Sequence, residues 1–144
     1  MVFAQSEISW LGAVVLMTAV GLLLVGSGWL VVRVTRRGAN GELGRNGWAG
    51  IRTRATLSSD EAWIAAQKAG AKPTILGGRL LIGTGIWSGL LGLTYGDTPD
   101  RAVAIWAVLV LVGTVVLLIF TLYGAWLGQA AAKAVQSEAG PEPA

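Results

Sequence analysis

The chain has 144 residues, of which 53% are hydrophobic and 13% are charged, whereas about 25% of an ordinary soluble domain is charged. It contains no Cys and no His. This absence excludes disulfides, Cys or His metal sites, His-ligated haem, and catalysis by a thiolate or an imidazole. Length and composition together favour a single membrane domain, residues 1–144, over a water-soluble domain.

Three long apolar runs predict three transmembrane helices. Residues 8–32 and 102–132 contain no charged residue, and each run exceeds the roughly 20 residues that cross a bilayer. A third run, 80–96, becomes long enough if its helix begins at Pro73 and the Arg79 guanidinium extends to the headgroups. We therefore expect an all-α integral membrane protein with spans at about 8–34, 73–96 and 102–129.

Tryptophans support the first and third spans. Trp10 and Trp29, like Trp106 and Trp126, lie about 20 positions apart, which along a helix is about 30 Å, the distance between the two aromatic belts of a membrane. A cleaved signal peptide is the alternative for the first run, but it requires basic residues before a short apolar core. Only Glu7 precedes this long run as a charged residue, so we expect a retained helix.

The distribution of charge predicts the orientation. Most of the eleven Lys and Arg lie between residues 33 and 79. Because basic loops stay in the cytoplasm, residues 35–72 are expected to be cytoplasmic, with the N-terminus outside and the C-terminus inside a bacterial plasma (inner) membrane. The tail, residues 133–144, ends in Gly-Pro-Glu-Pro-Ala and is expected to be disordered.

The middle span carries a glycine series of the small-xxx-small type, which lets helices approach closely. Its members are Gly78, Gly85, Gly89, Gly92 and Gly96. This helix-packing face either docks on a partner protein or packs only within the chain, against glycines of the first span (Gly21 and Gly28) and of the third (Gly113, Gly124 and Gly128). Trp87, in the middle of the span, is expected to be a packing residue.

The segment between the first two spans is expected to contain a short helix. Ser58-Ser59-Asp60-Glu61 fits a capping box, in which Ser58 caps the Glu61 amide and Glu61 reaches back to Ser58. This Ala-rich helix is expected from about Ser59 to Gly70, because Pro73 disfavours helix before it, and to lie at the membrane surface.

Two further expectations concern charged and aromatic side chains of this segment. Arg52 and Arg54 are expected to pair with the acidic residues Asp60 and Glu61. Two tryptophans, Trp48 and Trp63, are expected to anchor the segment in the interface.

One set of loop residues has a recognisable order: a Gly-Ile-Arg-Thr turn, a Thr-Leu-Ser step, an acidic pair and a Trp. The set is Asn46, Gly50, Ile51, Arg52, Thr53, Thr56, Leu57, Ser58, Asp60, Glu61 and Trp63. It resembles the loop signature of the SdpI family of bacterial immunity-type membrane proteins. The resemblance implies a protein that protects its host from a toxin peptide or, in some members, captures a transcriptional repressor at the membrane. Larger members look like six-helix proteins, and many carry a His where this chain has Gln67.

Two roles of this loop stay open: a structural turn that holds the loop on the bilayer, and a dedicated ligand site. Its basic charge favours anionic lipid headgroups, with contacts expected at Arg36, Arg37 and Arg79. An acidic patch on a partner protein is the second option. Nucleic acid is disfavoured because no recognition motif is present.

The sequence does not favour an enzyme, and no cofactor or metal site is expected. Its hydroxyls have no His base and its carboxylates are dispersed; only Asp60 and Glu61 are adjacent, and they point apart on a helix. We expect a non-catalytic protein that acts through protein contacts, first as an accessory subunit of a larger membrane complex such as a respiratory or transport assembly. The alternatives are an SdpI-like immunity or signalling protein and a small oligomeric transporter, for which the spans offer no continuous polar row.

Overall fold

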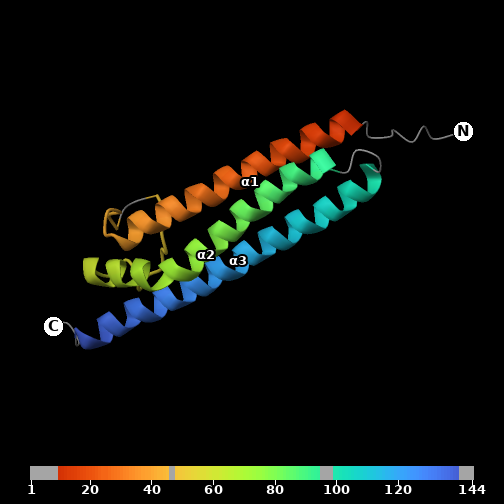
Figure 1. Cartoon of the computed structure of the whole chain (residues 1–144). Coiled ribbons are helices and arrows are strands. Elements are labelled where there is room, and N and C mark those ends of the chain that lie inside the picture. Colours follow the sequence, from red (N-terminus) through yellow and green to blue (C-terminus); the bar gives the residue numbers. More distant parts are fainter. Residues whose placement is uncertain (1–9, 46–47, 95–98, 140–144) are drawn as a thin grey trace, which may run out of the picture.

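The described part of the chain forms three long helices (Figure 1). The structure, a computed structural model, describes residues 10–45, 48–94 and 99–139. The helices are α1 (Trp10–Ala39), α2 (Asp60–Thr94) and α3 (Pro99–Glu138). Each is long and apolar enough to cross a membrane, which confirms the predicted all-α class with three candidate spans. Loop 40–59 joins α1 to α2.

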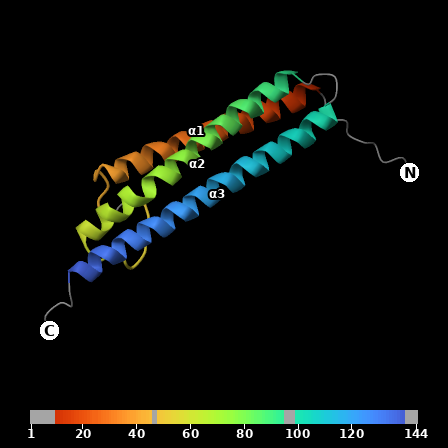
Figure 2. The ribbon, with the colours of Figure 1, turned by 60° about the horizontal axis from the view of Figure 1, so that its bottom comes forward.

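The central position in the bundle belongs to α2. It runs antiparallel to α1 and α3 and packs along both, whereas α1 and α3 barely contact each other (Figures 1 and 2). Large apolar side chains such as Leu23 and Leu111 stay exposed on the outer helices. Lipid is the solvent that suits such a surface. The fold is therefore a layer of three helices in which only α2 has neighbours on both sides.

Glycines bring α1 and α2 into backbone contact. A Cβ on Gly85 would lie 2.6 Å from the carbonyl oxygen of Gly21, and a Cβ on Gly28 would lie 2.6 Å from that of Gly78. Gly92 continues the face against Val14. The glycine series thus packs within the chain, with one exception: a Cβ on Gly89 would meet nothing within 4 Å. Gly96 lies outside the described residues.

The opposite side of α2 meets α3 through a different set of small residues. A Cβ on Gly70 would lie 2.6 Å from the carbonyl oxygen of Gly124, and one on Gly128 would lie 2.8 Å from that of Ala66. Gly113 faces Thr84. The glycines of α3 therefore do not face the series that meets α1.

One buried hydroxyl links all three helices. Ser88 of α2 is fully buried and donates a hydrogen bond to the carbonyl oxygen of Met17 in α1 (2.9 Å). It accepts one from the indole N–H of Trp106 in α3. Interhelical hydrogen bonds of this kind help to hold membrane helices together.

The short surface helix predicted to end before Pro73 is not a separate element. Helix α2 runs without interruption from Asp60 to Thr94, with Pro73 inside it. Proline removes one backbone donor and favours a kink, and α2 changes direction in this region (Figure 1). The Thr74 hydroxyl donates to the Gly70 carbonyl oxygen (2.9 Å). The prediction was wrong because packing of α2 against both neighbours outweighs the cost of the proline.

The helices are also longer than the predicted spans. At about 1.5 Å per residue, α3 is about 60 Å long, twice the roughly 30 Å of a hydrocarbon core. It continues to Glu138, so residues 133–138 are helical where a disordered tail was predicted; residues 140–144 lie outside the described part. Here the start of α2 and the end of α3 share a small core of Ala62, Ala66 and Ala132.

The tryptophans differ in their surroundings. Trp10, Trp29 and Trp126 are exposed on the outside of the helices, as side chains of an aromatic belt would be. Trp87 is 61% exposed, so the prediction of a packing residue was wrong.

Replacing Gly85 by alanine tests the backbone contact. The added methyl group would meet the Gly21 carbonyl oxygen, and G85A should destabilise the bundle by about 1–3 kcal/mol, as overpacking does. G89A is the matched control, because its methyl group enters open space. Thermal unfolding in detergent micelles measures both; equal melting temperatures for the two variants would contradict the close contact.

Candidate functional site

Loop 40–59 begins where α1 ends in a tight turn. Gly41 adopts a φ of 76°, and its amide donates to the Gly38 carbonyl oxygen (3.0 Å). Glu42 accepts hydrogen bonds from Asn40 (3.1 Å) and from Arg37 (3.2 Å). The Asn40 hydrogen bond, together with Arg37, lowers the pKa of Glu42. The carboxylate therefore stays charged and keeps the turn against the end of α1.

The centre of the loop is held by one side chain of α2. The Ile51 amide donates to the Gln67 side-chain oxygen (3.2 Å), and the Gln67 side-chain nitrogen donates to the Ile51 carbonyl oxygen (3.3 Å). Gln67 is 6% exposed. The side-chain amide of Gln67 thus pairs with both the N–H and the C=O of Ile51, as the backbone of a neighbouring β-strand would. Gly50 has a φ of 118°, and a Cβ on it would lie 2.9 Å from the Gln67 oxygen.

Two threonines close the next turn reciprocally. The Thr53 amide donates to the Thr56 hydroxyl oxygen (2.9 Å), and the Thr56 amide donates to the Thr53 hydroxyl oxygen (3.2 Å). The Thr56 hydroxyl, fully buried, donates to the Ile51 carbonyl oxygen (2.8 Å). The Ile51 carbonyl thus has two donors, and the turn is tied to the residue that Gln67 holds.

The Ile51 side chain fastens the loop to the bundle. Its Cδ1 fits into the notch between Gly70 of α2 and Gly128 of α3, where a Cβ on either glycine would collide with it. The loop therefore covers the α2–α3 contact at this end of the bundle.

The start of α2 differs from the predicted capping box by one residue. Ser59, not Ser58, is the N-cap: its hydroxyl oxygen accepts from the Ala62 amide (3.0 Å). Ser58 instead donates to the Ala55 carbonyl oxygen (2.8 Å). Only Ser58 has a Glu three residues later, so the capping-box pattern indicated the wrong serine, and the turn that precedes the helix makes Ser59 the cap.

The ion pair and the aromatic contacts of the loop also differ from expectation. Asp60 pairs with Arg45 (2.6 Å), which was not among the predicted partners; Arg45 also donates to the Leu57 carbonyl oxygen (3.3 Å). Trp63 is 2% exposed and donates to the Leu43 carbonyl oxygen (2.7 Å), so it is part of the core and not an interfacial anchor. Trp48 is fully exposed.

The remaining predicted residues that the structure describes lie on the surface. Arg54, Leu57 and Glu61 are exposed, and Asn46 lies outside the described residues. Of the predicted lipid contacts, Arg36, Arg37 and Arg79 are all exposed, and Arg37 is paired with Glu42. The guanidinium of Arg33 lies 5.1 Å from the centre of the Trp29 ring, a cation–π contact.

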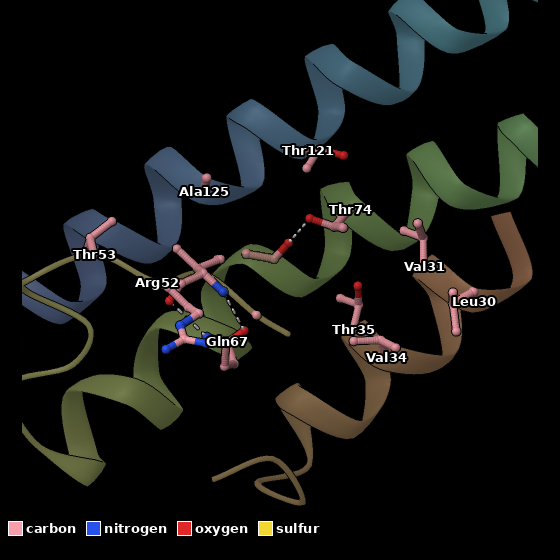
Figure 3. A pocket seen from close by; sticks show the side chains of 13 residues that line it. Leu30, Val31, Val34, Thr35, Arg52, Thr53, Gln67, Thr74, Thr121 and Ala125 are labelled. Carbon is pink, nitrogen blue, oxygen red and sulfur yellow. Dashed lines mark hydrogen bonds between the residues drawn. The ribbon is translucent and has the colours of Figure 1, made fainter. Parts of the chain in front are cut away.

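A pocket of about 510 Å³ lies between α1 and α3, over the face of α2 that they leave open (Figure 3). It extends from the loop, at Gly50–Thr53, along the helices, and we call it the interhelical pocket. Its lining residues are Leu30, Val31, Val34, Thr35, Gly50, Ile51, Arg52, Thr53, Gln67, Gly70, Thr74, Thr121 and Ala125. Four of the signature residues, Gly50 to Thr53, therefore form one end of a cavity.

Sequence reasoning missed Gln67 as a site residue. It stands one helical turn after Trp63, on the same side of α2, and this spacing is the signal that places both side chains under the loop. Among the residues that the structure describes, no group of three or more carboxylates lies together where a metal ion could bind.

A folded loop joined to three helices that are long and apolar enough to span a membrane defines a multi-pass membrane protein. The sequence model of the SdpI/YfhL protein family matches residues 42–124, more than half of the chain, and the chain belongs to this family. The predicted resemblance is thereby confirmed. Neither the search of curated proteins nor that of solved structures found a match.

Replacing Gln67 by alanine tests the attachment of the loop. Q67A leaves the partly buried Ile51 amide without its partner, at a cost of about 1–3 kcal/mol. Hydrogen exchange of the Ile51 amide and tryptic cleavage at Arg52 and Arg54 should both accelerate. The control is Q136A on the exposed surface of α3. If Ile51 exchanges equally slowly in Q67A, Gln67 does not hold the loop.

Proposed function

We propose that this protein is a non-catalytic immunity protein, which protects its host from a toxin peptide by binding it at the membrane. The observation that carries the proposal is the family match over residues 42–124. The match includes loop 40–59 from Glu42 onward and most of the spanning parts of α2 and α3. Immunity is the role that the family resemblance implies.

Two features of the structure support a binding role. The signature loop is folded by hydrogen bonds of Gln67 and Thr56 and by the Ile51 side chain, so its outer surface is preorganised. The outer faces of α1 and α3 are broad and apolar, and a membrane-inserted peptide can contact them without leaving the lipid. Preorganised surfaces lose little conformational entropy on binding.

The orientation that we propose places the loop in the cytoplasm of a bacterial cell and the N-terminus outside. The concentration of basic residues around the loop supports it through the positive-inside tendency. Anionic headgroups are then proposed as additional partners of Arg36, near the loop end of α1, and of Arg79, near the middle of α2; both side chains are exposed.

A growth experiment tests the immunity role. A strain that lacks the gene should be killed by culture supernatant of its parent, and the intact gene on a plasmid should restore growth. Q67A should protect less than Q136A at equal membrane abundance, because it loosens the signature loop. If the deletion strain grows normally and the tagged chain purifies in stoichiometric amounts with a large membrane complex, the chain is an accessory subunit and the immunity proposal is wrong.

Single cysteines test the orientation, because the chain has none of its own. Gly44 is exposed, and a Cβ there meets nothing within 4 Å. G44C in intact cells should resist a membrane-impermeant maleimide and react after lysis. T94C, exposed at the opposite end of α2, should react from outside. The reverse pattern would invert the proposed orientation.

A further inference from the structure

The interhelical pocket changes in character along its length. The part away from the loop is bounded by Leu30 and Val31 of α1 and by two threonines. The hydroxyls of these threonines, Thr74 and Thr121, donate to carbonyl oxygens of their own helices (2.9 and 2.8 Å) and so present their methyl groups. The part beneath the loop presents Arg52, Thr53 and Gln67 (Figure 3). One end of the cavity is therefore apolar and the other polar, as the two ends of a lipid are.

The pocket lies at the depth where the polar and apolar parts of a bilayer meet. Trp29 directly precedes the lining residue Leu30, and Trp126 directly follows the lining residue Ala125; both tryptophans are exposed. Exposed tryptophans of membrane helices sit at the level of the headgroups. The pocket therefore lies at the level of the headgroups, with its polar end toward the loop and its apolar end toward the middle of the helices.

The charge of the pocket favours an anion. Among the described residues that line it, Arg52 is the only ionisable one, and none is acidic. A guanidinium carries five N–H donors, so it can bind a phosphate while it keeps contacts within the chain. The neighbouring Thr53 and Thr35 add hydroxyl groups at the same end.

The size of the pocket favours a small amphiphile over a peptide helix. Its volume of about 510 Å³ falls within the roughly 300–1,000 Å³ of small-molecule sites. A helix with its side chains is about 10–12 Å wide and would have to separate α1 from α3, which α2 holds at a fixed distance through glycine contacts.

We propose that the interhelical pocket binds one anionic phospholipid, with an acyl chain between α1 and α3 and its phosphate at Arg52. The proposal does not depend on the immunity role. An acyl chain gains little free energy by moving from the surrounding lipid into an apolar groove. The charge of the headgroup therefore decides which lipid is retained. A single basic residue near the surface corresponds to about a fivefold preference for the anionic lipid.

Native mass spectrometry of the full chain tests the proposal. The protein is purified in mild detergent that contains equal amounts of palmitoyl-oleoyl phosphatidylglycerol and phosphatidylcholine, and the retained lipid is identified. The wild type should retain one phosphatidylglycerol. R52Q should lose the preference for it, whereas R54Q, in the same loop but outside the pocket, should keep it. A125F, which fills the groove, should retain neither lipid.

Circular dichroism and thermal unfolding establish that the variants are folded. Equal retention of the two lipids by the wild type would overturn the proposal, as would retention of phosphatidylglycerol that both R52Q and A125F leave unchanged. If A125F abolishes immunity while lipid retention is unaltered, the pocket is a peptide site and the lipid proposal is wrong. Should A125F unfold, the comparison of R52Q with R54Q decides alone.

Discussion

Close backbone contact on both sides of α2 is the constraint on which the remaining structure depends. Lipid supplies no hydrophobic force between helices, so small residues and a few hydrogen bonds must hold the bundle. Glycines of α2 meet α1 on one side and α3 on the other, and Ser88 links all three helices. Because α2 occupies the middle, α1 and α3 stay apart, and the pocket between them is a direct result.

The loop depends on the same contacts. Ile51 can fasten it only because Gly70 and Gly128 leave a notch where α2 meets α3. Gln67 can reach the Ile51 peptide only because α2 continues past Pro73 toward the loop. The family signature is thus largely a description of how a polar loop is attached to a membrane bundle, and one signature residue, Arg52, also lines the interhelical pocket.

Patterns with a strong physical cause could be predicted from the sequence: three apolar spans and a recognisable loop signature. Details that depend on packing could not. Pro73 predicts a break, but the neighbours of α2 override a local preference. The capping-box pattern indicates Ser58, whereas the folded turn makes Ser59 the cap. Trp63 looks like an interfacial anchor until Leu43, distant in sequence, is seen to accept its N–H.

The contacts of the glycines also govern how this sequence can drift during evolution. At Gly21, Gly28 and Gly85 a side chain would meet a carbonyl oxygen of the next helix, whereas Gly26 and Gly83 face open space. Relatives can carry alanine or a larger residue at positions such as Gly26 and Gly83 without moving a helix. The number of glycines alone is therefore a poor criterion for membership of the family. The glycines that contact the backbone of another helix are the ones that relatives with this fold are expected to retain.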